Sequence, residues 1–268
     1  MTATPPPVRD WRGVLPVPRT SLTPRQIQTE TTLVLLAGLG ASAIYAVLSI
    51  LRKLSDSLPL AEQTTTMNNS QAQNSWLDLA YQLVGIGLGL VTVGLALYFL
   101  SREIRSPARF VGFDTSKPGP DLALGVVLTA VIGIPGLGLY LVARAMGLNT
   151  TIAASALGED WWSLPVLVLA AIQNGVLEEV VMVGFLFTRW SQAGWSLPKV
   201  VLVSALIRGT YHLYQGFGGF VGNIVMGIVF GAVYARTRRV MPLVIAHALL
   251  DIVAFVGYAL LKDQVSWL

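Results

Sequence analysis

Six ionisable side chains stand inside stretches of the chain that are otherwise apolar, and they form three short groups. They are Glu178 with Glu179, Arg208 with His212, and His247 with Asp251. Both histidines of the protein are among them. A charge in the middle of a bilayer is costly, so such residues face a bundle interior or a wet cavity and commonly serve a function. We predict that these side chains line one buried catalytic cavity.

The two glutamates are neighbours on a predicted helix, where adjacent side chains point about 100° apart. One of Glu178 and Glu179 should therefore face the chemistry, while the other meets a cation or a hydrogen-bond donor. Burial in an apolar cavity disfavours the charged form of a carboxylate and makes it a stronger base toward water. Taken alone, the pair could equally belong to a buried ion-pair network or an ion pathway.

The other two groups share a spacing of four residues, which places both members on the same face of a helix. A lone histidine within a membrane is more often an interhelical hydrogen-bonding group than a catalyst. His212, however, lies one turn from Arg208. Asp251 could hold the tautomer and orientation of His247, as carboxylates do for catalytic and metal-bound histidines. His247 and Asp251 could instead both bind a metal.

The composition indicates the elements that must position these residues. Of the 268 residues, 54% are hydrophobic and 12% are charged, whereas soluble domains carry about 25% charged residues. We therefore predict an all-α fold, a polytopic bundle of about seven transmembrane helices, each with about 20 mainly apolar residues. The expected spans are Thr31–Leu51, Trp76–Leu100, Leu122–Ala143, Leu164–Phe187, Val200–Tyr214, Phe220–Tyr234 and Met241–Leu261. The catalytic cavity should lie between the C-terminal helices.

The distribution of basic residues predicts the topology. Lysine and arginine gather before the first span and in the second, fourth and sixth loops, so the N-terminus should be cytoplasmic and the C-terminus outside. Residues 1–30 are rich in proline and arginine, and we predict a disordered cytoplasmic tail there. Residues 31–268 should form a single membrane domain, with the motifs in 160–261. The polar loop 55–75 is expected to be a flexible exterior excursion.

Taken together, the three groups resemble the motifs of the CAAX-protease and bacteriocin-processing family of intramembrane proteases, the type II CAAX prenyl endopeptidases and their bacterial relatives. That family carries a Glu-Glu pair usually followed by three residues and an Arg, a His preceded four residues earlier by Phe, and His-x-x-x-Asn/Asp. The segments here are Glu178–Val183, Arg208–His212 and His247–Asp251. Their order and spacing match, whereas the N-terminal half matches only as generic spans.

The resemblance implies an intramembrane endopeptidase, a hydrolase of a bacterial plasma membrane that cleaves a membrane-associated protein or peptide. By the same resemblance, Glu178 and His212 would activate the attacking water. His247 and Asp251 would stabilise the oxyanion of the tetrahedral intermediate, and Glu179 would support the site. Prenylated substrates follow from family analogy alone.

Two positions depart from the family motifs. Val183 stands where the arginine is expected, and Arg208 stands where the phenylalanine is expected. We hypothesise that these departures compensate, with Arg208 supplying the missing cation and pairing with Glu179.

Whether the protein needs a metal cofactor depends on the state of Asp251. An ionised Asp251 would repel an oxyanion, so it must be protonated, act through His247, or bind a metal. A zinc ion held by His212, His247 and Glu178, with an open position for water, is a chemically reasonable alternative. Because the chain contains no His-Glu-x-x-His helix, we favour a metal-independent glutamate mechanism without a cofactor.

Other functional classes remain as alternatives. The same fold could serve as a non-catalytic membrane scaffold or bacteriocin-immunity protein. Buried Glu and His residues also form proton relays in transporters, although the chain lacks paired Gly/Pro-broken segments in two matching halves. The net charge of +4 does not indicate nucleic acid, because the basic residues follow the loops. We expect the bilayer and a membrane-bound peptide or protein as partners.

Overall fold

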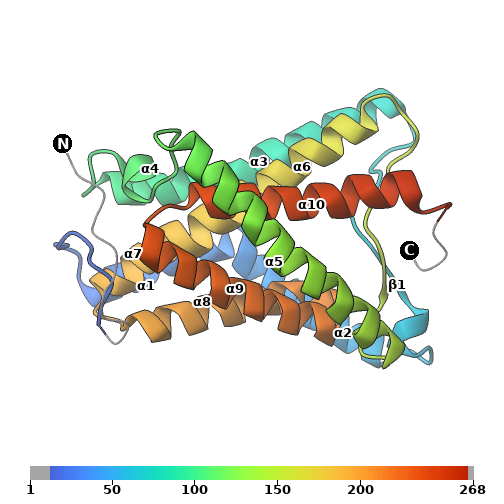
Figure 1. Cartoon of the computed structure of the whole chain (residues 1–268), viewed down its shortest axis with the longest axis horizontal. Coiled ribbons are helices and arrows are strands. Elements are labelled where there is room, and N and C mark those ends of the chain that lie inside the picture. Colours follow the sequence, from blue (N-terminus) through green and yellow to red (C-terminus); the bar gives the residue numbers. More distant parts are fainter. Residues whose placement is uncertain (1–12, 265–268) are drawn as a thin grey trace.

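The computed structural model describes residues 13–264, which form a bundle of helices with nearly no sheet (Figure 1). The all-α class is confirmed. The helices are α1 (Pro24–Leu36), α2 (Leu39–Leu54), α3 (Ser75–Ser101), α4 (Pro107–Phe110), α5 (Pro118–Ala145), α6 (Ser163–Glu178), α7 (Leu186–Gln192), α8 (Leu197–His212), α9 (Phe217–Thr237) and α10 (Met241–Leu261). The shorter elements are η1 (Leu60–Glu62), β1 (Thr64–Thr66), β2 (Thr151–Ala153), the π-helical η2 (Glu179–Phe185) and η3 (Leu213–Gln215).

Within residues 13–264, five helical rods are long and apolar enough to cross a membrane: α3, α5, the rod Ser163–Gln192 that joins α6 to α7, α9 and α10. The bent pair α1 and α2 could form a sixth. α8, with 16 residues, lies where the short span Val200–Tyr214 is predicted but is not among these candidates. The five or six candidate spans among the described residues are roughly consistent with the expected seven.

The first predicted span, Thr31–Leu51, is not one straight helix. The chain turns by 59° between α1 and α2. At the break, the Thr92 hydroxyl on α3 donates to the Ala37 carbonyl at 3.2 Å, which satisfies an acceptor that the helix has released. Gly38 faces the same threonine, and a Cβ there would lie 3.2 Å from the Thr92 hydroxyl oxygen. Beyond the break, α2 packs along α8, whereas α1 packs beside α3.

The predicted disordered tail is corrected for residues 13–30, while residues 1–12 lie outside the described residues. Leu15 is buried in the main core, and the Arg238 guanidinium donates to the Pro16 carbonyl at 2.9 Å. Helix α1 already begins at Pro24, after a capping box in which Thr23 and Gln26 bond each other. Ile27 and Val34 are buried one and three turns along, so α1 docks through an apolar stripe.

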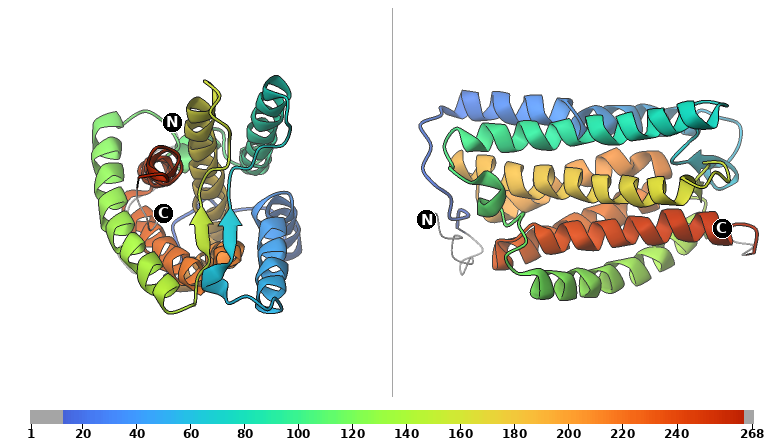
Figure 2. Two further views of the ribbon diagram at one scale, coloured as in Figure 1. Left: turned by 90° about the vertical axis from the view of Figure 1, so that its right-hand side faces the viewer. Right: turned by 90° about the horizontal axis from the view of Figure 1, so that it is seen from above.

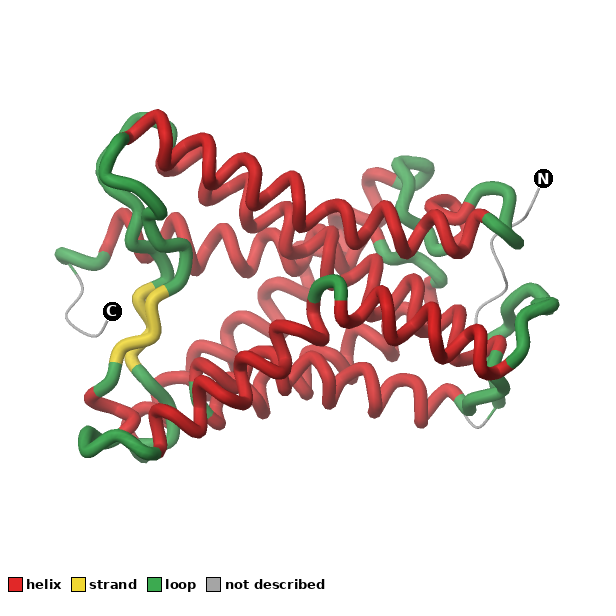
Figure 3. Tube along the Cα trace, turned by 180° about the vertical axis from the view of Figure 1, so that it is seen from behind, coloured by secondary structure: helices red, strands yellow, loops and turns green. Residues whose placement is uncertain are grey.

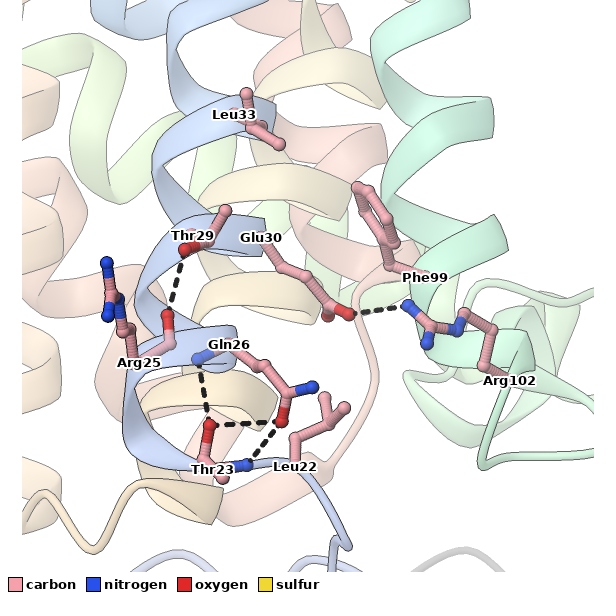
Figure 4. Close-up of a pocket in the computed structure, with 9 residues that line it drawn as sticks. All are labelled: Leu22, Thr23, Arg25, Gln26, Thr29, Glu30, Leu33, Phe99 and Arg102. Atoms are coloured by element: carbon pink, nitrogen blue, oxygen red, sulfur yellow. Dashed lines mark hydrogen bonds and ion pairs between the residues drawn. The ribbon is translucent and has the colours of Figure 1, made fainter.

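A buried ion network joins α1 to the bundle. Arg189 on α7 is fully buried and lies 2.8 Å from Glu30 on α1 and 2.5 Å from Glu103. Arg102 reaches the same Glu30 at 2.9 Å. A pocket of about 350 Å³ opens between α1 and the end of α3, with Glu30 and Arg102 facing each other across it (Figure 4). The pocket contains none of the charged residues singled out by the sequence motifs.

A second ion cluster fastens the loop before α5 to the turn between α9 and α10. Arg239 lies 2.6 Å from Asp121 and 3.0 Å from Asp114. Burial by itself disfavours ionised Asp114, but hydrogen bonds from Ser116 and Arg239 outweigh it and lower the pKa of Asp114 from 3.8 to about 2. The ionised carboxylate therefore stabilises the folded state.

This cluster predicts an acid-dependent loss of stability. A carboxyl group whose pKa is lowered by folding stabilises the folded state at every pH above its ordinary pKa. For Asp114 this stabilisation is lost as the pH falls through about 2. The melting temperature of Asp114→Asn should therefore fall less than that of the wild type over the acid limb. Glu159→Gln, in an exposed loop, is the matched control and should follow the wild type. An unchanged acid slope in Asp114→Asn would contradict this assignment.

Candidate active site

The glutamate pair lies where the α6 rod changes its winding. Glu178 is the last residue of α6, and Glu179 begins the π-helical segment η2, whose seven residues are all buried. A π segment widens the helical turn and is often found at functional sites. The Ser204 hydroxyl on α8 donates to the Met182 carbonyl at 2.9 Å, which satisfies one backbone acceptor of the widened turn. This change of winding sets the directions of both carboxylates.

Small residues let the neighbouring helices approach the glutamates closely. A Cβ on Gly175 of α6 would lie 2.9 Å from the Val244 carbonyl oxygen of α10. A Cβ on Gly227 of α9 would lie 2.9 Å from the Ala205 Cα of α8. Such contacts bring helix backbones together. The first contact brings α10, which carries His247, against α6, and the second packs α9 against the stretch of α8 that carries Arg208.

Arg208 lies between the two carboxylates. Its guanidinium is 1% exposed, with Nη1 3.3 Å from Glu178 Oε2 and Nη2 2.8 Å from the Glu179 carboxylate. The hypothesised pair of Arg208 and Glu179 is therefore present in the structure. Glu178 also contacts the cation, which the sequence did not anticipate.

Glu179, rather than Asp251, holds His247. The Nδ1 atom of His247 lies 2.7 Å from Glu179 Oε1, and both side chains are buried. Its Nε2 atom lies 3.9 Å from Asp251 Oδ1, which is too long for a hydrogen bond. Asp251 instead accepts a hydrogen bond from Asn174 on α6 at 3.0 Å. The predicted orienting role of Asp251 is thus corrected, because a carboxylate from another helix lies closer to the imidazole.

His212, the last residue of α8, lies beside Glu178 with both ring nitrogens buried. Its Nε2 atom lies 3.8 Å from Glu178 Oε2, and its side chain is 16% exposed. Within the described part of the chain, neither ring nitrogen has a hydrogen-bond partner. The ring packs beside Tyr211 and Tyr214, with centroid separations of 4.8 and 6.5 Å. His212 is therefore available to bind a water molecule or a substrate group.

Two polar residues of the site escaped the sequence reasoning. The Tyr211 hydroxyl donates to Glu178 Oε2 at 2.6 Å, and Asn174 holds Asp251. Asn174 lies one helical turn before Glu178, a spacing that could have drawn attention to it. Tyr211 carries no such signal, because tyrosines are common near helix ends in membrane proteins.

The donor set was tested for a metal ion. Ligand atoms of Glu178, Glu179 and His247 all lie within 4.8 Å of one another. For the predicted alternative, Glu178 Oε2 lies 3.8 Å from His212 Nε2 and 3.9 Å from His247 Nε2. Both sets offer donors that zinc accepts. The Arg208 guanidinium, however, already contacts both carboxylates, and a dication held by them would face this positive charge.

Comparison with known proteins identifies the same part of the chain. Residues 160–253 match the family model described as type II CAAX prenyl endopeptidase Rce1-like. The match runs from just before α6 into α10 and contains the three charged groups. No curated protein and no solved structure matches the chain. The segment is thus an Rce1-like domain, which confirms the resemblance and supports a CAAX-type intramembrane protease at the level of the family.

Proposed function

We propose that this protein is an intramembrane endopeptidase that hydrolyses a peptide bond of a membrane-associated protein or peptide. In this proposal Glu178 and His212 activate the water. The observation that carries it is the 3.8 Å separation between Glu178 Oε2 and the unpartnered Nε2 of His212. This distance is too long for a direct hydrogen bond, but one water molecule can bond both atoms at about 2.8 Å.

The proposed reaction follows from that placement. Glu178 removes a proton from the water as its oxygen attacks the carbonyl carbon of the scissile bond. The carbonyl oxygen takes up negative charge, and the N–H group of His247 that faces Glu178 stabilises it. When the C–N bond breaks, Glu178 returns the proton to the leaving nitrogen, and the products are an amine and a carboxylic acid, which then ionises. Glu178, His212 and His247 are thus the proposed catalytic residues.

The remaining polar groups position these three. Glu179 holds Nδ1 of His247 and directs Nε2 toward Glu178, 3.9 Å away. Asp251, held by Asn174, lies 3.9 Å from Nε2 of His247 and would influence that imidazole through its charge rather than through a direct hydrogen bond. Arg208 would balance the charge of the two glutamates. No cofactor is required in this scheme, and zinc remains the alternative that the experiment below tests.

The location in the membrane belongs to the same proposal. We place the protein in a bacterial plasma membrane, with the N-terminus cytoplasmic and the C-terminus outside. The basic segments Arg102–Arg109 and Arg236–Arg239 lie at the end of the bundle where α1 begins, as Figure 1 shows from the positions of α4 and the α9–α10 turn. By the positive-inside rule, this distribution supports a cytoplasmic location for that end.

One observation favours the alternative of a non-catalytic scaffold or immunity protein. Glu178 Oε2 already accepts from Tyr211 and contacts Arg208, an arrangement that also suits a purely structural ion network. The two functions differ in whether any peptide is hydrolysed.

The test is cleavage of a broad library of membrane-tethered peptides by the purified full-length protein in lipid. Wild type is compared with Glu178→Gln, each with and without a chelator. We expect cleavage that the substitution abolishes and the chelator leaves intact. Loss of cleavage with the chelator would replace the glutamate mechanism with a metal-dependent one. An inactive wild type would favour the scaffold.

A smaller effect is expected for Glu179→Gln. Glutamine can present either oxygen or an NH₂ group to Nδ1 of His247, so the imidazole loses its fixed tautomer and orientation. Removal of such a supporting partner lowers activity about 10- to 100-fold, and we expect the loss in kcat rather than in KM. The pH profile of kcat should shift as well, a readout that structural damage alone would not move. A change confined to KM would contradict this role.

A further inference from the structure

Two short parallel strands bridge the helices at the end of the bundle where α8 ends. β1 and β2 pair with Thr64 opposite Thr151 and Thr66 opposite Ala153. Figure 3 shows the pair crossing between two groups of helices that diverge toward this end, and Figure 2 shows β1 and β2 side by side there. Part of loop 55–75, predicted to be flexible, is therefore ordered as η1 and β1.

The strand pair is bonded to the segment that directly follows His212. Thr150, just before β2, donates to the Gln215 carbonyl through its backbone N–H at 3.0 Å and its hydroxyl at 2.9 Å. Lys53 on α2 donates to the Tyr214 carbonyl at 2.5 Å and also binds Thr65 of β1. The strand pair is thus fastened to the carbonyl groups of Tyr214 and Gln215, two and three residues after His212.

The outer edge of β1 has unused backbone groups. Thr151 donates to the Gln63 carbonyl at 3.0 Å and Met67 donates to the Ala153 carbonyl at 2.8 Å. In a parallel ladder this register turns both the N–H and the C=O of Thr64 and Thr66 away from β2. Among the bonds of residues 13–264, none involves these four groups, and both residues are exposed.

The outer edge of β2 differs, because its outward donor already has a partner. Its outward N–H, on Ile152, donates to the Tyr140 hydroxyl of α5 at 3.1 Å. The open hydrogen-bonding edge of the pair is therefore the β1 edge.

We propose that the outer edge of β1 binds the substrate as an added extended strand next to the catalytic groups. This inference rests on the proposed endopeptidase function. A scissile bond must be extended to expose its carbonyl carbon, and an extended backbone offers alternating C=O and N–H groups. Those groups complement the free donors and acceptors of Thr64 and Thr66, as in strand addition to an exposed sheet edge. The occupant is a non-helical peptide segment without proline at the paired positions.

The first test removes one outward donor and keeps the sheet. Proline at position 66 lacks the N–H that faces away from β2, whereas the ladder uses groups of Thr65 and Met67. Thr66→Ala keeps the N–H and separates loss of the side chain from loss of the donor. For a cleaved peptide, KM of Thr66→Pro should exceed that of Thr66→Ala by about 3- to 10-fold, with similar kcat. Equal KM values in two folded variants would overturn the proposal.

The second test detects binding without hydrolysis. A photoreactive amino acid at position 64 of the full-length Glu178→Gln protein is irradiated with the same lipid-anchored peptides in vesicles. Cross-links to peptide, reduced in Thr66→Pro, support strand addition even when the wild type cleaves nothing, so the binding site and the proposed activity are judged separately. Cross-links between two copies of the chain would identify the edge as a dimer contact and overturn the proposal, as would the absence of cross-links.

Discussion

Glu178→Gln is expected to lower kcat/KM by about 10²- to 10⁴-fold, the range that a general base contributes. Glutamine has nearly the same shape and can still accept the 2.6 Å hydrogen bond from the Tyr211 hydroxyl. It cannot take a proton from water. The loss should therefore appear in kcat, and the melting temperature should stay close to that of the wild type because Arg208 keeps Glu179 as its partner.

The control for Glu178→Gln is the same substitution at a glutamate outside the site. Glu159→Gln makes the same chemical change in an exposed loop and should retain wild-type kcat/KM on the same peptides. A Glu178→Gln variant that cleaves as fast as this control would remove Glu178 from the mechanism and leave it a structural partner of Arg208.

Arg208→Met should destabilise the protein by about 3–5 kcal/mol, the cost of removing one partner from a buried ion pair. The guanidinium is 1% exposed and is the cation shared by Glu178 and Glu179, at 3.3 and 2.8 Å. Methionine fills a similar volume but leaves two adjacent carboxylates without it. Lys199→Met is the matched control, because Lys199 is an exposed cation on the same helix. Denaturation in detergent should show a much smaller change for the control; equal losses would contradict the pairing.

Exchanging the residues at positions 183 and 208 tests whether Arg208 replaces the arginine that the family motif has at the position of Val183. Val183 is 2% exposed within η2, one turn beyond Glu179 and at the position of the family arginine. Val183→Arg and Arg208→Phe should each be harmful, and the double variant should recover part of the loss if either helix can supply the cation. A double variant no more active than the worse single variant would show that the positions do not substitute for each other.

The sequence by itself pointed to six of the ionisable side chains that gather at the candidate site and to most of the main spans, but not to Asn174 or Tyr211. Carboxylates, arginine and histidine inside apolar stretches can be recognised from the segment alone. Burying a charge in lipid is costly whichever helices pack against that segment. The spacing of Arg208 and His212 is equally local, since 3.6 residues per turn put positions four apart on one face. The pairing of Arg208 with Glu179 was anticipated from the two departures from the family motifs, and the structure contains it.

The tertiary structure decided which groups touch. Asp251 lies four residues from His247, yet Glu179 holds that imidazole, because the π turn at the end of α6 and the close approach at Gly175 bring the carboxylate nearer. The break at Gly38, the docking of α1 and the pairing of β1 with β2 likewise depend on contacts between segments far apart in the chain. Helix rotation and crossing follow from packing across the whole bundle, and the spacing of residues along one helix does not contain that information.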